Sequence, residues 1–344
     1  GTFWVYSIIS APIDNDGVPV GTPALEGTAT FTSFNDKEAE LEAQGLRVFG
    51  PNATLAEDVE PEFIAVSADS ETAYVTLQEN NGVAVVDIAS ATVTSILPLG
   101  FKDYTKAENA IDPSNEDGIV AFRTNLTFSL FGVYQPDAIA TFSTGGTEYL
   151  ITANEGDARE YEGTPGFVGE DRAADITLDA TAFPDAATIQ EERNYGRLNV
   201  MLDLGDTDND GDYDELYSYG ARSFSIWSTS GSLVFDSGND LDVRANANGI
   251  YADGRSDDKG VEPEGVAIGT YGDRVFAFIG LERVDAVAVY EVTNPSSPTY
   301  LTIINAGDAP EGLVFVPASE SPNNRSLLIV SSEDDGVVTV YQTN

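Results

Sequence analysis

The chain of 344 residues contains no cysteine and no histidine, and these two absences exclude much of enzyme chemistry. Without cysteine there can be no disulfide and no thiol nucleophile. Without histidine, the chain lacks the commonest general base at neutral pH and the commonest transition-metal ligand. The sequence therefore excludes Ser-His-Asp and Cys-His catalytic sites and ordinary zinc sites.

Positive charge is also scarce. The chain has 16 Lys and Arg against 58 Asp and Glu, which gives a formal net charge of −42. A surface with this charge repels nucleic acid and anionic membranes, so we expect no nucleic-acid partner, and it attracts cations. No hydrophobic run reaches the ~18 residues that a membrane-spanning helix needs, so we also expect no transmembrane segment.

One short segment concentrates the negative charge. The sequence GDTDNDGDYDEL, residues 205–216, fits a D-x-D-x-D-G-x-x-D pattern with Gly211 at the sharp turn that a calcium loop needs. Unlike an EF-hand it has Tyr217 at position twelve, and no amphipathic helix leads into it. We predict a structural calcium site in a loop between strands, the alternative being a solvated polar turn. The candidate metal ligands are Asp206, Asp208, Asp210, Asp212 and Asp214. Together with the acid excess and the lack of cysteine, this loop favours an extracellular location.

Most of the remaining sequence alternates apolar and polar residues in short runs that end in Gly, Asn, Asp or Pro, as β-strands do. Only residues 35–45 and 184–193 have a helical pattern. One strand pattern recurs four times, at residues 60–100, 135–238, 262–305 and 309–342. The second copy is interrupted by an insertion at 156–219 that carries the acidic loop, and the fourth copy has only three strands.

Four-stranded units that repeat along the chain predict an all-β protein with a β-propeller fold. We expect residues 1–344 to form a single propeller domain or a portion of one, with about four blades of a larger propeller of the seven-bladed type. An incomplete propeller exposes strand edges. We therefore expect self-assembly, or a companion chain or segment that completes the propeller.

The repeat also places acids at fixed points. In a propeller the start of each first strand and the end of each second strand lie on the same face, so eight carboxylates should surround one mouth. They are Glu62, Asp137, Glu264 and Glu311 on the first strands, and Glu79, Glu155, Glu282 and Glu333 on the second strands. We expect the acidic loop on the same face. The acids either lock neighbouring blades together, through backbone N–H groups and Arg159, Arg222 and Arg283, or form a metal or ligand site.

Eight motifs in fixed order resemble a known family. They are VTLQENN, PLGFKD, YQPDAIA, LITANEGDAREY, GARSFSIW, DDKGVEPEGVA, FIGLER and PEGLVFVP. These motifs are similar to the choice-of-anchor I domain, a secreted or surface β-propeller of bacteria that is also similar to mesenchyme-specific cell-surface glycoproteins and to part of atypical cyanobacterial alkaline phosphatases. The resemblance covers residues 25–342 and implies a propeller at the cell surface.

Two functions are consistent with these observations. The first is a calcium-binding extracellular surface or matrix protein with a structural, adhesive or assembly role. The alternative is a calcium-dependent phosphoesterase of the alkaline phosphatase or phytase type, in which metal-activated water needs neither His nor Cys. Its candidate metal ligands are Glu155, Asp157, Glu264 and Glu282, and its candidate phosphate-binding residues are Arg159, Arg255, Lys259 and Arg283. Whether the protein is an enzyme stays open at this point.

Overall fold

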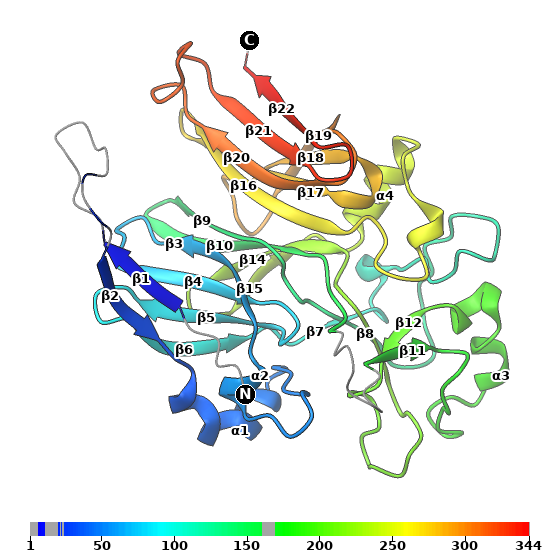
Figure 1. Ribbon diagram of the computed structural model, residues 1–344. Helices are drawn as coiled ribbons and strands as arrows, with labels where there is room; N and C mark the ends of the chain where they lie inside the picture. Colours follow the sequence, from blue (N-terminus) through cyan, green and yellow to red (C-terminus); the bar gives the residue numbers. More distant parts are fainter. Residues whose placement is uncertain (1–5, 11–19, 21, 23, 160–168, 344) are drawn as a thin grey trace.

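The computed structural model describes residues 6–10, 20, 22, 24–159 and 169–343. The protein is all-β, as predicted, and consists of successive, mostly antiparallel sheets with a few short helices (Figure 1). Three sheets have four strands and a fourth has three strands, and they follow one another in the order of the four sequence repeats. The repeat is therefore confirmed at the level of strands and sheets.

The strands of the four repeats are bounded as follows. The first sheet contains β3 (Pro61–Val66), β4 (Thr72–Leu77), β5 (Gly82–Asp87) and β6 (Thr92–Pro98). The second contains β9 (Ile139–Thr144), β10 (Thr147–Asn154), β14 (Ser223–Ser228) and β15 (Leu233–Asp236). The third contains β16 (Pro263–Tyr271), β17 (Arg274–Leu281), β18 (Ala286–Glu291) and β19 (Thr299–Asn305), and the last contains β20 (Pro310–Val316), β21 (Leu327–Ser332) and β22 (Val337–Gln342).

The sheets pack face to face. Successive side chains of a strand point to opposite faces of its sheet, so the apolar side chains on a face can pack against the neighbouring sheet. One core lies between the first and second sheets and includes Tyr74, Leu150 and Trp227. A second, the largest, joins the second and third sheets, and a third joins the third and last sheets around Val287 and Val330. The first strands β3, β9, β16 and β20 contact one another in that order. Their beginnings therefore lie close together.

The first strands share a local distortion that determines where their acids point. In β3, β16 and β20 the pairing register shifts just after the opening proline, between Pro61 and Ile64, between Pro263 and Val266, and between Pro310 and Leu313. Such a bulge puts two residues opposite one and re-aims their side chains. In three copies the residue before the proline has a left-handed backbone, with φ of 42° at Gln135, 52° at Glu262 and 55° at Ala309.

The insertion does not stand apart from the repeats. Its strand β13 (Leu216–Ser218) pairs in parallel with β8 (Leu130–Val133), which pairs with β7 (Phe101–Asp103), so the insertion shares a sheet with the connection between the first two repeats. A second small sheet contains β11 (Glu170–Arg172) and β12 (Asn199–Met201). The sequence pattern did not reveal this long connection as a structured unit.

The helices are short. Both predicted helical segments contain one, α1 (Glu38–Glu42) after a 3-10 turn at Thr32–Lys37, and α3 (Ala186–Ile189) before a π turn at Glu192–Gly196. Two helices were not predicted, α2 (Leu55–Asp58) and α4 (Asp240–Ala247). A capping box formed by Thr54 and Glu57 begins α2. Further 3-10 turns lie at Ala107–Asn109, Asp253–Arg255 and Glu282–Val284. Within the described ranges, no helix is long and apolar enough to cross a membrane.

The N-terminal segment covers the outer face of the first sheet. Strands β1 (Tyr6–Ser10) and β2 (Ala24–Ala29) form a hairpin, and Phe31, Phe34 and Leu55 pack with Val75 and Ala84 in one core. Residues 28–34, which alternate like a strand in the sequence, leave the strand at Ala29 and continue as the 3-10 turn. The chain turns after Ala29 because the turn buries Phe31 and Phe34 against the first sheet.

Candidate functional site

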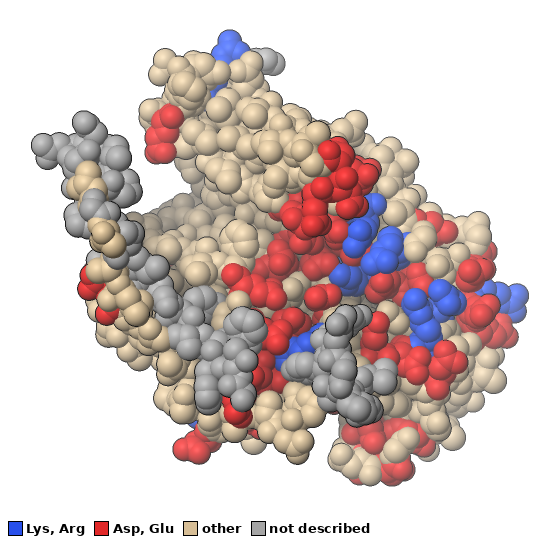
Figure 2. Space-filling view, viewed as in Figure 1, with Lys and Arg blue, Asp and Glu red and all other residues tan. Residues whose placement is uncertain are grey.

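The repeat places one acid in, or just before, the beginning of each first strand. Glu62, Glu264 and Glu311 each follow the opening proline of a first strand, and Asp137 occupies the same place before β9. Figure 2 shows acidic side chains gathered across the middle of one view of the molecule, with Lys and Arg concentrated on one side of them. We call this surface the acidic face, defined by these four acids and the acids that follow the second strands.

The pKa values of the first-strand acids report how close they lie. Loss of water and the charges of Glu155 and Asp137 raise the pKa of Glu264 to about 10. Burial and the neighbouring Glu311 raise the pKa of Asp137 to about 6. The Glu62 side chain is exposed by surface area, yet surrounding protein removes much of its water, and this effect together with Glu79 raises its pKa to about 9.

The second-strand acids lie on the same face. Glu79, Glu155, Glu282 and Glu333 follow β4, β10, β17 and β21, and each of them is a charged neighbour of a first-strand acid. Burial raises the pKa of Glu79 to about 7 and also raises that of Glu155, in both cases against the opposing charge of a nearby cation. The structure therefore brings together the eight carboxylates that the repeat pattern had grouped.

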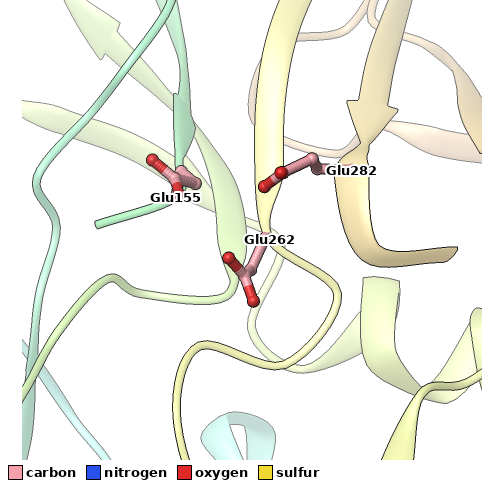
Figure 3. A group of neighbouring side chains, drawn as sticks. All are labelled: Glu155, Glu262 and Glu282. Atoms are coloured by element: carbon pink, nitrogen blue, oxygen red, sulfur yellow. The ribbon is translucent and has the colours of Figure 1, made fainter. Parts of the chain in front are cut away.

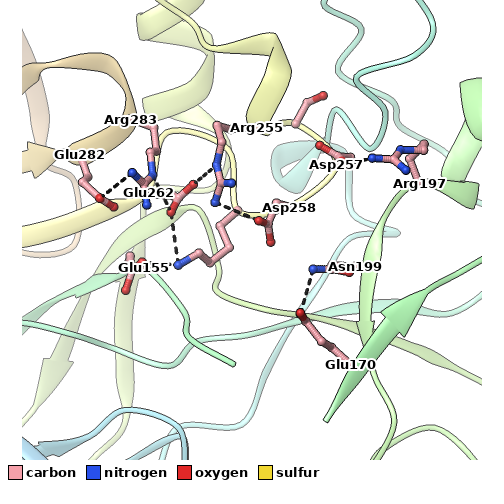
Figure 4. Close-up of polar contacts among 12 residues, drawn as sticks. Glu155, Glu170, Arg197, Asn199, Arg255, Asp257, Asp258, Glu262, Glu282 and Arg283 are labelled. Atoms are coloured by element: carbon pink, nitrogen blue, oxygen red, sulfur yellow. Dashed lines mark hydrogen bonds and ion pairs between the residues drawn. The ribbon is translucent and has the colours of Figure 1, made fainter. Parts of the chain in front are cut away.

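One half of the acidic face is neutralised by side chains of the protein. Carboxylate oxygens of Glu155, Glu262 and Glu282 lie within 4.8 Å of one another, and all three residues are buried (Figure 3). Lys259 forms an ion pair with Glu155 and lies 3.2 Å from Glu262. Arg255 lies 2.7 Å from Glu262 (Figure 4).

Glu262 is the hub of this half, and our sequence reasoning had not selected it. Burial alone would raise its pKa, but Lys259, Arg255 and Arg283 together hold it below the ordinary value. Arg283 also lies 3.0 Å from Glu282. The available signal was the motif Glu-Pro-Glu at 262–264, in which we had read only the second glutamate.

The other half of the acidic face has no such compensation. Within the described ranges, Glu62, Asp137 and Glu264 form no ion pair with Lys or Arg. Asp157, which follows Glu155 in the second copy, is exposed and is a charged neighbour of both Glu62 and Asp137. Lys259 lowers the pKa of Asp137 without forming an ion pair with it, and protons, water or external cations must relieve the remaining repulsion among these four acids.

Arg159 serves a different purpose from the one we expected. Its guanidinium lies 2.8 Å from Asp58 and 3.3 Å from Glu60, and its planar face stacks on Phe49. The residue is 6% exposed. It therefore ties the beginning of the insertion to the segment before β3, through Asp58 and Glu60 rather than through the repeated acids that we expected as its partners.

The acidic loop separates into two groups of carboxylates. Oxygens of Asp206, Asp208 and Asp210 lie within 4.8 Å of one another, and a second group contains Asp179, Asp212 and Asp214. Asp179 was missed because it lies 27 positions before Asp206 in the sequence and only the fold brings it there. The second group includes Asp214, whose carboxylate accepts hydrogen bonds from the backbone N–H and hydroxyl of Thr207.

The aspartates of the acidic loop act chiefly on one another. The neighbours that raise the pKa of Asp208 are the aspartates at 206, 210 and 214, with Asp210 the largest. Those that raise the pKa of Asp212, after loss of water, are loop aspartates and Asp179. None of them belongs to the acidic face.

Comparison with known proteins places the chain in a family. Gigasin-3a of Magallana gigas is 29% identical over 189 aligned positions, covering 45% of this chain and 66% of that protein. The mesenchyme-specific cell surface glycoprotein of Strongylocentrotus purpuratus is 27% identical over 345 aligned positions, covering 83% of this chain and 43% of that protein. The chain thus spans less than two thirds of the length of either relative.

Among solved structures, the periplasmic gluconolactonase PpgL of Pseudomonas aeruginosa aligns with 99% of this chain and 68% of its own length, at 12% identity and a TM-score of 0.36. The family model of the choice-of-anchor I domain matches residues 7–295, which is most of the chain. The protein therefore belongs to the choice-of-anchor I domain family.

Proposed function

We propose that this protein is a calcium-binding protein of the cell surface or extracellular matrix, with a structural, adhesive or assembly role. The carrying observation is the triad of Asp206, Asp208 and Asp210, whose carboxylate oxygens lie within 4.8 Å of one another on an exposed loop. Family membership and the name of the sea-urchin relative, a cell surface glycoprotein, support the location. The net charge of −42 supports a cation as partner.

The chemistry of the loop suits a hard cation. Calcium takes six to eight oxygen ligands at ~2.3–2.6 Å, from carboxylates, carbonyls and water. The loop offers carboxylates in both of its groups, and Gly211, with φ of 100°, makes the sharp turn between them. Mutual repulsion, led by Asp210, raises the pKa of Asp208, and a bound divalent cation would relieve it.

We further propose that the four sheets are blades of a β-propeller, part of a larger one of the seven-bladed type. Support comes from the first strands, which contact one another in the order β3, β9, β16 and β20, as the inner strands of a propeller do. It also comes from the bulge that recurs at the start of three of them.

The last sheet supports the proposal of self-assembly or of a companion chain or segment. One face of β20–β22 packs on the third sheet through Leu328 and Val330. The opposite face carries Val314, Val338 and Val340, which are 57%, 65% and 55% exposed. In a chain this acidic, an exposed apolar sheet face is where a further sheet would pack.

The phosphoesterase alternative has weaker support. Arg255, Lys259 and Arg283, which would hold phosphate, are each engaged by buried or half-buried carboxylates. Binding phosphate would require breaking those ion pairs next to an excess of acid. Release of phosphate from p-nitrophenyl phosphate in millimolar calcium, abolished in Glu264→Gln, would establish the alternative in spite of this.

Calcium titration by calorimetry on chelator-treated protein tests the main proposal. The wild type should bind calcium, and at ~100-fold excess over the dissociation constant calcium should add about 2.7 kcal/mol to the free energy of unfolding. Asp208→Asn and Asp210→Asn together should remove the binding heat. Asp273→Asn, at an exposed turn between β16 and β17, is the matched control. Absence of binding, with a melting temperature that chelator leaves unchanged, would reject the proposal.

A further inference from the structure

Several buried polar atoms without hydrogen-bond partners gather around Arg222. This residue precedes β14, is 2% exposed and has a left-handed φ of 53°. One terminal nitrogen of its guanidinium donates to the carbonyl of Asp112 at 2.9 Å, and the other donates to the carbonyls of Ser256 and Asp258 at 2.7 and 2.8 Å. The Nε–H group is buried and has no hydrogen-bond partner among the described residues.

Three more unpartnered atoms come from other parts of the chain. In the part of the chain that the structure describes, Oδ2 of Asp242 on α4, Oδ1 of Asp112 and the hydroxyl of Tyr251 are each buried without a hydrogen bond. The second oxygen of each carboxylate is already used, since Asp242 accepts from the N–H of Val261 and Asp112 from that of Ala121. Tyr251, Asp242 and Asp112 are all charged or ionisable neighbours of Arg222. We call these four residues the Arg222 site.

The spacing within the Arg222 site is too long for direct contact. Nη1 of Arg222 lies 4.0 Å from Oδ2 of Asp242, beyond hydrogen-bond distance, although both side chains are almost completely buried. Buried polar groups are normally paired, and a gap of this length between two of them is where a bridging water sits.

The donors and acceptors identify the ligand. The site offers two donors, the Nε–H of Arg222 and the hydroxyl of Tyr251, and two carboxylate acceptors. A metal cation would use neither donor and would be repelled by the guanidinium, and an anion would be repelled by two aspartates. Water accepts two hydrogen bonds and donates two. We propose that the Arg222 site holds ordered buried water, which bridges Arg222 to Asp242, Asp112 and Tyr251.

The water site positions a functional segment. Arg222 holds the carbonyls of Ser256 and Asp258, and Asp242 holds the N–H of Val261, so both ends of the segment 256–261 are fixed from behind. Gly260, with φ of 70°, allows the backbone to pass within contact distance of Asp242. The same segment carries Lys259, which reaches Glu155 and Glu262 on the acidic face. The bridged ion pair is thus a positioning device for the neutralised half of that face.

A crystal structure of the whole chain with ordered solvent tests the site directly. We expect water density within hydrogen-bond distance of both Arg222 Nε and Asp242 Oδ2, with further contacts to Tyr251. A direct Arg222–Asp242 hydrogen bond with no density between them would overturn the proposal. So would a metal ion at this place, which anomalous scattering and metal analysis distinguish from water.

Hydrogen exchange in solution tests the positioning role. Tyr251→Phe removes one donor to the water without changing the ring, and Asp242→Asn is the stronger variant if it folds. Each should speed exchange of the backbone N–H groups in 256–261 by about tenfold, the size expected for the loss of a buried hydrogen bond. Tyr271→Phe, an exposed tyrosine at the end of β16, is the matched control. Unchanged exchange in Tyr251→Phe would show that the site does not hold the segment.

Discussion

Replacing Lys259 by methionine should destabilise the protein by about 2–3 kcal/mol at pH 7. Its side chain is 12% exposed and forms an ion pair with Glu155, whose side chain is 10% exposed. Within the described ranges, no other Lys or Arg is within ion-pair distance of Glu155. Glu262 keeps Arg255 and Arg283 in the variant, so the loss falls on Glu155.

The magnitude follows from the proton that Glu155 takes up when it loses this partner. The ordinary pKa of a glutamate is 4.5. Holding a proton on it at pH 7 costs about 1.4 kcal/mol for each pH unit above that value, an upper limit of about 3.4 kcal/mol. Burial raises the pKa of Glu155 and Lys259 opposes this rise, so part of the cost is present before the substitution and the expected loss lies below the upper limit.

The pH dependence gives the prediction its sign. A carboxyl group whose pKa is raised by folding stabilises the fold below its unfolded pKa and loses that contribution as pH rises. The cost of Lys259→Met should therefore shrink from about 2–3 kcal/mol at pH 7 to less than about 1 kcal/mol at pH 5. Urea unfolding at both pH values measures this difference.

Two further variants make the measurement specific. Lys106→Met is the matched control, because its ammonium is exposed and lies 4.0 Å from Asp103, and it should change stability by less than about 0.5 kcal/mol. Glu155→Gln in the Lys259→Met background removes the unpaired charge and should restore most of the stability. An equal loss at pH 5 and pH 7, or no rescue by glutamine, would show that lost packing rather than charge explains the effect, and would refute the reasoning.

Three other predictions follow from the same structure. In chelator, the melting temperature should fall as pH rises from about 5 to 9, because folding raises the pKa of Glu264 to about 10. Glu264→Gln should flatten this decline, and an unchanged slope would contradict the raised pKa of Glu264. Gly220→Ala should lower the free energy of unfolding by more than about 3 kcal/mol, because a Cβ there would lie 2.0 Å from the carbonyl oxygen of Glu155. Gly272→Ala, which has open space around it, should lower it by about 1 kcal/mol, and thermal unfolding of both variants measures the difference. Val340→Glu should reduce self-association in sedimentation velocity without lowering the melting temperature, and a wild type that stays monomeric at all concentrations would argue against a second copy as the partner.

Much of the fold could be predicted from the sequence, because the strands are short runs rich in apolar residues and their ends carry turn residues. The segments expected for the third repeat coincide with β16–β19, and those for the first with β3–β6. The grouping of Glu62, Glu264 and Glu311 could also be predicted, since equal places in a repeat occupy equal places in the fold.

The pairing of charges could not be predicted in the same way. Lys259 and Glu155 are 104 positions apart, and nothing local to either residue indicates the other. The same holds for Asp179 in the acidic loop and for Arg159, which bonds with Asp58 rather than with the acids beside it. Long-range packing of the insertion against the connection of β7 and β8 decides these contacts, and a repeat pattern carries no information about a segment outside the repeat.

The bulge at the start of β3, β16 and β20 links the acid to the core in a way that limits how the sequence can change. Because side chains alternate along a strand, removing one residue from the bulge would turn every following residue to the opposite face. In β16, Val266 and Ile268 would exchange places with Ala267, and the two neighbouring sheets would each meet the wrong surface. Insertions and deletions at these positions would therefore disrupt the core. Substitution of the acid alters the acidic face while every other side chain of the strand stays on its own face of the sheet.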